Sequence, residues 1–226
     1  MRALQMSSLR LIKRKLGPIV FHTSIPRYNQ LLTEISVEAR LLGLFGNITV
    51  PENCLPAKRT TGENKITGLY FGSAPAAQYH PLFAQKLKEF CEKNLLPLEL
   101  IICGKSGVNG ENFADEIAAA CKGLHFEIVF LGELSPEALS DLFLKADFGI
   151  ARIPPLFLGK SGSAISMLEH GLPLWVPLMG KDSISENLDF RPELCFHNLE
   201  DIKLMERREC ISRLPHIADK FIQALN

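Results

Sequence analysis

The stretch that decides the fold is ADFGIARIPPLFLGKSGSAISMLEHGLPLWVP, residues 146–177. It begins with a short apolar run, 147–151, and Pro154-Pro155 lie just beyond it. A short apolar run bounded in this way is expected of a buried parallel strand. From 163 to 170 the apolar residues recur at helical spacing, and Gly171 stands where a helix C-cap glycine belongs. A second apolar run follows at 174–176. The stretch therefore predicts a strand, a glycine-bearing turn, a helix and another strand, which together form a βαβ unit.

The turn between this strand and helix predicts an anion site. Backbone N–H groups and the positive end of a helix dipole both favour negative charge at such a turn. Gly159 and Gly162 let a phosphate approach the main chain, Ser161 and Ser163 offer hydroxyl donors, and Lys160 adds a cation. The set suits a diphosphate, and the alternative is an ordinary loop, because short glycine-rich matches are frequent by chance.

One face of the predicted helix continues from this turn. Gly162, Ser166 and Glu169 are spaced i, i+4, i+7 and share that face. The carboxylate of Glu169 is therefore expected about 10 Å beyond the turn, a reach that suits the sugar hydroxyls of a nucleotide. The alternative is that Glu169 is a solvated surface acid.

Strand-like and helix-like patterns alternate regularly before this stretch. We expect strands at 66–71, 98–103 and 126–131, and helices at 76–93, 112–122 and from Pro136, with Ser135 as the N-cap of the last. The alternation predicts an α/β fold with a doubly wound parallel sheet, Rossmann-like, whose ligands bind beyond the carboxyl ends of the strands.

Glycines mark those strand ends. These glycines are Gly72, which Ser73 follows, Gly104 and Gly132. Each can line a ligand cleft, because a glycine lets a ligand approach the main chain. The alternative is that each is part of an ordinary turn. Arg152 directly follows the fourth strand. It is, with Lys160, the cation expected to neutralise a diphosphate.

In this order the elements resemble the donor-binding half of GT-B glycosyltransferases, the family 4-like group that uses nucleotide-diphosphate sugars. The resemblance covers about residues 64–200, and more weakly 18–50, and its motifs are Asp147, Pro154, Lys160-Ser161-Gly162-Ser163 and Glu169-His170-Gly171-Leu172-Pro173. It implies transfer of a hexosyl group from a UDP or GDP sugar to an acceptor, a saccharide or a lipid-linked glycan. It also implies Lys160 and Arg152 as catalytic cations, and neither a cofactor nor a metal.

The chain departs from the family pattern at two places. The family usually carries Glu-x7-Glu, and aligned on Gly171 those positions are Leu158 and Ser166, so Glu169 is the candidate substitute one turn later. Ser73 stands where the family often has the arginine that pairs with the leaving diphosphate. These departures keep a second hypothesis open, a catalytically inactive nucleotide-sugar-binding subunit or remnant that needs a partner chain. A nucleotide-sugar epimerase ranks third, because few acids lie near the predicted strand ends.

Composition narrows the protein class. The chain has 226 residues, 46% of them hydrophobic, and a formal net charge of zero, which argues against a nucleic-acid partner. Six cysteines without a Cys-x-x-Cys pair favour reduced thiols in a cytoplasmic protein over a disulfide framework or a zinc site. There is no Asp-x-Asp motif and no histidine cluster with metal-ligand spacing. No apolar run approaches a membrane span of about 18 to 20 residues, and the protein is expected to be soluble.

The sequence predicts two parts, an N-terminal segment and a larger domain. Residues 1–55 are expected to be a partial acceptor-side segment with a linker, and 56–226 the donor nucleotide-sugar-binding domain. The N-terminal part predicts a basic helix at 1–16, a strand at 18–22 and a helix at 26–42; the tail predicts a sixth strand at 194–196 and a helix at 205–225 packed on the core. The basic helix either is solvated or makes weak contact with an anionic membrane surface. A partner chain or a homodimer is expected to cover the apolar surface of 18–50.

Overall fold

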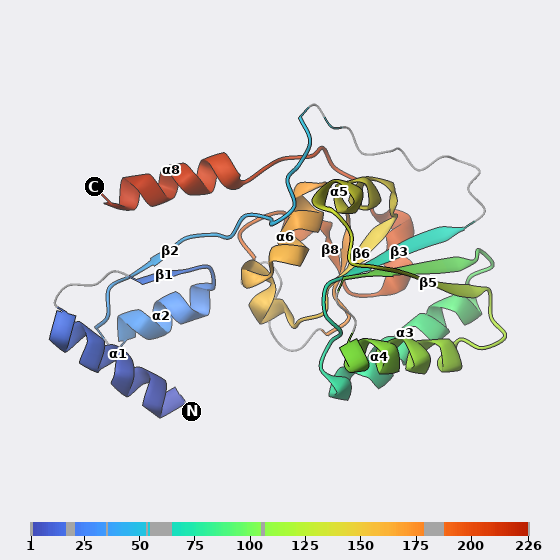
Figure 1. Ribbon diagram of the computed structural model, residues 1–226, viewed down its shortest axis with the longest axis horizontal. Coiled ribbons are helices and arrows are strands. Elements are labelled where there is room, and N and C mark those ends of the chain that lie inside the picture. Colours follow the sequence, from blue (N-terminus) through green and yellow to red (C-terminus); the bar gives the residue numbers. More distant parts are fainter. Residues whose placement is uncertain are drawn as a thin grey trace.

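The main sheet of the protein has six parallel strands in the order β5-β4-β3-β6-β7-β8 (Figure 1). The computed structural model describes residues 2–16, 21–34, 36–52, 54, 65–104, 107–178 and 188–225. The strands are β3 Ile66–Phe71, β4 Leu98–Cys103, β5 Phe126–Gly132, β6 Phe148–Ile150, β7 Leu174–Trp175 and β8 Cys195–Phe196. This is the strand order of the Rossmann fold, so the predicted doubly wound α/β class is confirmed.

Helices cover both faces of this sheet. They are α3 His80–Lys93, α4 Gly107–Ala120, α5 Pro136–Lys145 and α6 Gly162–Glu169, with short 3-10 turns η1 Ala77–Tyr79, η2 Pro155–Lys160, η3 Pro192–Leu194 and η4 Leu199–Leu204. The expected N-cap is present at α5, where Ser135 Oγ accepts a hydrogen bond from the backbone N–H of Ala138 at 3.2 Å. Figure 1 shows α3 and α4 on one side of the sheet and α5 on the other.

The core has two layers because side chains alternate across each strand. On β3, Ile66 and Tyr70 pack with residues of α3 and α4. Leu69, which points to the opposite face, packs with residues of α5 and α6. The sheet is thus buried on both sides, which is the usual environment of parallel strands.

A second, small sheet lies at the N-terminal side. It pairs β1 Phe21–Thr23 with β2 Ala39–Leu41 in parallel, and α2 Pro26–Glu34 connects them; α1 Arg2–Leu16 precedes them. The C-terminal helix, α8 Leu214–Leu225, leaves the main sheet and lies beside this small sheet (Figure 1). The rings of His22 and Phe221 are 5.4 Å apart, and Arg40 Nη1 donates to the carbonyl oxygen of Ala224 at 2.7 Å.

Three of the expected helices are wrong in extent. The helix predicted at 112–122 is α4, which begins five residues earlier, at Gly107. The helix predicted at 26–42 ends at Glu34, because Ser36 has a left-handed φ of 58° and the chain then enters β2. The helix predicted at 205–225 begins only at Leu214. Before it, the backbone N–H groups of Arg208 and Ile211 donate to carbonyl oxygens at the end of α6, so this segment runs along α6 instead of forming its own helix.

The predicted packing of the tail is also largely wrong. Ile217 is buried as expected, whereas Ile211, Leu214 and Phe221 are each more than two-fifths exposed. The side chain of Leu225, and most of the predicted linker at 51–65, lie outside the described residues. Within the part of the chain that is described, no helix combines the length and the apolar character needed to cross a membrane.

Candidate functional site at the carboxyl ends of β3 and β6

The order of the strands creates a switch point between β3 and β6. From β3 the chain proceeds to β4 on one side, and from β6 it proceeds to β7 on the other. The connections therefore diverge between these two strands, and open α/β sheets bind ligands beyond the carboxyl ends of the strands at such a point. Gly72 and Ser73 follow β3 at this point, and Arg152 follows β6.

Arg152 and Ser73 are in direct contact across the switch point. Arg152 Nη1 donates a hydrogen bond to Ser73 Oγ at 2.6 Å. The hydroxyl of Tyr70 donates to the carbonyl oxygen of Ser73 at 2.8 Å and so holds the turn after β3. Gly72 has a φ of +120°, which favours glycine, and a Cβ there would lie 3.5 Å from Arg152 Nε. The turn thus brings its backbone close to the guanidinium.

The charge of Arg152 is incompletely satisfied. Its Nε is buried without a hydrogen-bond partner, and no carboxylate of the described residues forms an ion pair with it. Burial raises the pKa of Tyr70 far above its usual range, and the nearby charge of Arg152 opposes that shift. A buried, unpartnered donor on a cation is costly unless a further acceptor satisfies it. The switch point therefore has the charge and the free donor that an anionic ligand needs.

The three strand-end glycines lie side by side along this edge. The N–H of Gly72 donates to the carbonyl oxygen of Cys103 at 3.0 Å, and that of Gly104 donates to Gly132 at 2.7 Å. Gly104 has a φ of +113°, and a Cβ there would lie only 3.1 Å from backbone atoms of Gly72. The structure thus brings Gly72, Gly104 and Gly132 together, as expected for turns at one edge of a parallel sheet. Lys105 and Ser106 lie outside the described residues.

The turn before α6 forms a second group. Ser161 is the N-cap of α6, and its Oγ accepts from the N–H of Ala164 at 3.3 Å and lies 3.2 Å from Ser163 Oγ. Gly159 is buried, whereas Lys160 is exposed and its Nζ lies 4.4 Å from the ring centroid of Phe157. The serine hydroxyls are thus partly used in capping, and Lys160 presents its charge at the surface.

Ser166 and Glu169 do share a face of α6, but the chain's own backbone covers that face. Ser166 Oγ accepts from the N–H groups of Asn47 and Ile48 at 2.9 and 3.2 Å. A Cβ on Gly46 would lie 2.5 Å from Glu169 Oε2. Ser166 and Glu169 are 0% and 2% exposed, so the alternative of a solvated acid is wrong for Glu169. We call residues 43–48 the cover segment.

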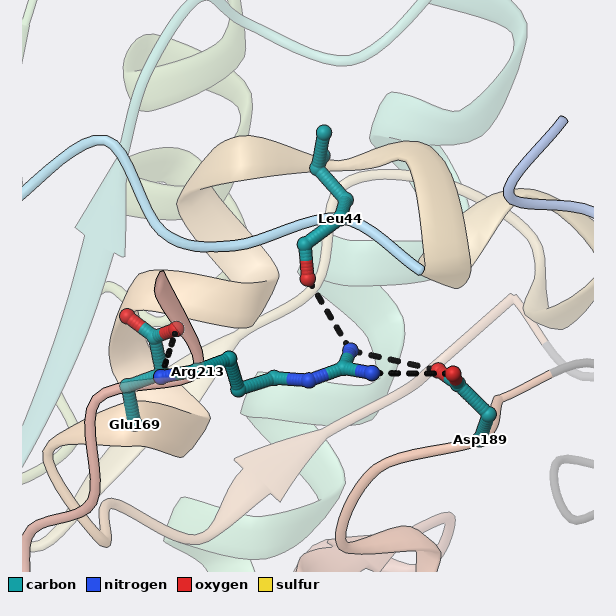
Figure 2. Close-up of polar contacts among 4 residues, drawn as sticks. All are labelled: Leu44, Glu169, Asp189 and Arg213. Carbon is teal, nitrogen blue, oxygen red and sulfur yellow. Dashed lines mark hydrogen bonds and ion pairs between the residues drawn. The ribbon is translucent and has the colours of Figure 1, made fainter. Parts of the chain in front are cut away.

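Arg213 also holds the cover segment, through a contact with Leu44 (Figure 2). Its guanidinium donates to both carboxylate oxygens of Asp189, at 3.2 and 2.8 Å, and to the carbonyl oxygen of Leu44 at 3.0 Å. Its backbone N–H donates to Glu169 Oε1 at 2.9 Å. Burial raises the pKa of Glu169, and its hydrogen bonds and the charge of Arg213 oppose that shift.

The sequence does not predict the contacts of the cover segment with Ser166 and Arg213, because nothing near Asn47 or Arg213 forms a recognisable motif. The isolated glycines at 43 and 46 were the available signal: a Cβ at Gly43 would lie 2.5 Å from Arg213 Nη2. A glycine outside a predicted turn indicates close approach of another part of the chain.

Among the described residues, no group of three or more His, Cys, Asp or Glu side chains is placed so that it could hold a metal ion.

Comparison with known proteins gives structural similarity alone. No protein-family model matches the sequence. No curated protein matches it either. Among solved structures, the apo form of the lipopolysaccharide outer core galactosyltransferase WaaB is similar, with 11% identity and a TM-score of 0.49 over 88% of this chain and 57% of that one.

Two further solved structures are similar over less of this chain. Anabaena HepE in complex with UDP and glucose has 11% identity and a TM-score of 0.46, over 77% of this chain and 49% of that one. A glycosyltransferase from Rickettsia africae has 12% identity and a TM-score of 0.48, over 78% and 49%. The chain spans about half the length of the structures it matches. This likeness concerns the fold, and function is argued from the chain's own residues.

Proposed function

We propose that this chain binds a nucleotide-diphosphate sugar at the carboxyl ends of β3 and β6 and serves as the donor-binding half of a glycosyltransferase. The observation that carries the proposal is the placement of Arg152. It stands at the switch point, contacts Ser73 on the neighbouring strand end, and keeps a buried Nε without a partner. A planar, permanently charged fork of donors suits the diphosphate of such a ligand.

The contact between Arg152 and Ser73 suggests how this chain replaces the arginine that the family often has at position 73. The resembled family often carries that arginine directly after the first strand of the domain, where this chain has Ser73. Here the guanidinium of Arg152 reaches the same turn from the neighbouring strand end, 2.6 Å from Ser73 Oγ. We infer that Arg152 supplies from β6 the charge that the family supplies after β3.

The chemistry of the site would be electrostatic. When the bond between the sugar and the diphosphate breaks, negative charge grows on the departing diphosphate. Arg152 and Lys160 would stabilise that charge, and the backbone at Gly72 and Gly104 would let the phosphates approach. We propose that this requires no divalent metal. Ser166 and Glu169 would reach the nucleotide only after the cover segment had left α6.

A second candidate is a nucleotide-sugar-binding subunit without transfer activity of its own. It is favoured by the small sheet of β1 and β2, which among the described residues has two strands and no further strand beside them. Isolated two-stranded sheets are marginal in water, and parallel sheets are normally covered on both faces. We therefore propose that further polypeptide, from a partner chain or a second copy, completes that side and binds the saccharide or lipid-linked acceptor.

Two more parts of the proposal concern location. The described cysteines are free, which suits a cytoplasmic protein. The helix α1 has no acidic residue in its first turn and exposes Leu11 and Ile12, which supports weak contact with an anionic membrane surface.

Calorimetric titration of UDP and GDP against the chain, with and without excess chelator, tests this proposal. We expect saturable binding of one or both nucleotides, unchanged by chelation. No binding of either nucleotide would overturn the donor site, and loss of binding on chelation would overturn its metal independence. Assays of transfer from UDP and GDP sugars, with and without candidate partner chains, separate the two candidate functions.

A further inference from the structure

Two cysteines distant in the sequence meet in this fold. The Sγ atoms of Cys54 and Cys210 are 3.1 Å apart, although 156 positions separate the residues. Both side chains are half-buried, so a small solute can reach them. A disulfide requires an S–S distance of about 2.05 Å, so a shift of about 1 Å would bring these sulfurs to bonding distance.

One cysteine follows, and the other lies within, a segment that packs on α6. Cys54 lies six residues after the cover segment, whose Asn47 and Ile48 donate to Ser166. Cys210 lies in residues 205–213, which we call the strap. The strap is fastened to the end of α6 through the N–H of Arg208 on Gly171 and the N–H of Ile211 on Glu169.

We propose that Cys54 and Cys210 form a redox-active dithiol, whose oxidation by a peroxide or a small-molecule disulfide joins the strap covalently to the chain six residues after the cover segment. The resulting disulfide fixes the cover segment over Ser166 and Glu169. In the reduced protein only hydrogen bonds, packing and the Arg213 contacts hold it there.

The oxidation is balanced with hydrogen peroxide as the oxidant. The thiolate of Cys54 attacks one peroxide oxygen, which gives a sulfenic acid at Cys54 and releases hydroxide. The thiol of Cys210 then attacks that sulfur, the S–S bond forms, and the hydroxyl group leaves with the proton of Cys210 as water. The two sulfurs lose two electrons in total, and the peroxide gains them.

The surroundings of Cys210 favour its role as the second thiol to react. Burial and the contact with Cys54 raise the pKa of Cys210 to about 12, against the opposing charges of Arg207 and Arg191. Its Sγ lies 3.6 Å from the carbonyl oxygen of His170, to which the thiol donates. A protonated thiol is a poor first nucleophile, so Cys54 is assigned the first attack.

The fold supplies an internal comparison. Cys91 and Cys121 also interact, but their side chains are only 6% and 2% exposed. An oxidant in solution therefore reaches Cys54 and Cys210 more readily than the buried pair. Oxidation should be selective for the pair that joins the strap to the linker.

The first experiment maps the oxidised bond. The purified chain is treated with hydrogen peroxide or with oxidised glutathione, blocked with an alkylating reagent, digested with trypsin and analysed by mass spectrometry. We expect a linked species of peptides 41–58 and 209–213, which dithiothreitol separates. In Cys54→Ser and Cys210→Ser the species should be absent. Overoxidised or glutathione-capped Cys54 without that bond, or a preferred bond at Cys91 and Cys121, would overturn the proposal.

The second experiment measures the cover segment itself. Oxidation should slow amide hydrogen exchange at Asn47 and Ile48 by tenfold or more. The melting temperature should rise by roughly 5 to 15 °C, because the bond closes a very long loop. Neither change should occur in Cys54→Ser. Unchanged exchange at Asn47 and Ile48 in a fully disulfide-bonded sample would overturn the locking role. Both experiments omit nucleotide, so their outcome is independent of the proposed donor site.

Discussion

Arg152 Nη1 lies 2.6 Å from Ser73 Oγ and so joins the carboxyl ends of β6 and β3 at the point where the order of the strand connections reverses. Neither residue alone makes a recognisable site. Together they place a cation beside a glycine-bearing turn whose backbone is held by the hydroxyl of Tyr70. The anion-binding proposal rests on this pair and on the unpartnered Nε of the arginine.

Replacement of Lys160 tests the second cation. A charge-assisted contact with a diphosphate contributes about 1.5 to 3 kcal/mol, so Lys160→Ala should weaken UDP or GDP binding roughly tenfold or more. Because the side chain of Lys160 is exposed, its removal should leave the fold intact, and an unchanged melting temperature checks this. Equal affinities of the variant and the wild type in calorimetry would remove Lys160 from the site.

Removal of the Arg213 side chain should destabilise the fold. The side chain of Arg213 is 6% exposed, and its loss leaves Asp189 and the carbonyl oxygen of Leu44 without their partner. We expect Arg213→Ala to lower the free energy of unfolding by roughly 2 to 4 kcal/mol, reduced from a fully buried pair because Asp189 is partly exposed.

Urea denaturation measures this change, and Arg40→Ala is the matched control. Arg40 also binds a carboxylate and a backbone carbonyl, but at an exposed position. Its loss should cost less than about 1 kcal/mol. If both variants lose the same small amount, Arg213 does not fasten the cover segment.

His170 should make stability fall in mild acid. Its side chain is fully buried, Nδ1 donates to the carbonyl oxygen of Ser166 at 2.7 Å, and Nε2 lies 2.9 Å from Ser140 Oγ. Burial lowers the pKa of His170 below its ordinary value of 6.5. The folded state therefore binds this proton less readily than the unfolded state. The contribution of neutral His170 to the free energy of unfolding is complete above the unfolded-state pKa. It is lost as the pH falls from there through the folded-state pKa.

The measurement compares wild type with His170→Gln by urea denaturation between pH 7.5 and 5, where a single such proton contributes a slope of up to about 1.4 kcal/mol per pH unit. The free-energy difference between the two proteins should shrink as the pH falls. A constant difference across this range would show that His170 does not titrate between the two states.

The sequence predicts the main sheet well because its strands and caps are local features. Strands β3 and β4 begin and end where their apolar runs do, and Ser135-Pro136 marks the start of α5. The helix predicted at 205–225 failed for a tertiary reason. The segment at 205–213 satisfies its backbone on the end of α6, a contact that no local pattern indicates.

The candidate site was predictable in part for the same reason. Glycines after strands identify the edge of the sheet, so Gly72, Gly104 and Gly132 could be placed together from the sequence. The i, i+4, i+7 spacing correctly puts Ser166 and Glu169 on one helix face. It cannot indicate what covers that face, because the cover segment lies more than a hundred residues earlier in the chain.

The most direct test of the central claim is calorimetric titration of UDP and GDP against wild type, Arg152→Ala, and Arg152→Ala combined with Ser73→Arg. The account predicts that Arg152→Ala weakens binding about tenfold or more, and that an arginine at position 73 restores most of it, since either strand end can supply the charge to the same switch point. Arg40→Ala, a remote arginine variant, should bind as wild type does. Unchanged affinity in Arg152→Ala, with the protein folded, would contradict the assignment of the diphosphate to the switch point between β3 and β6.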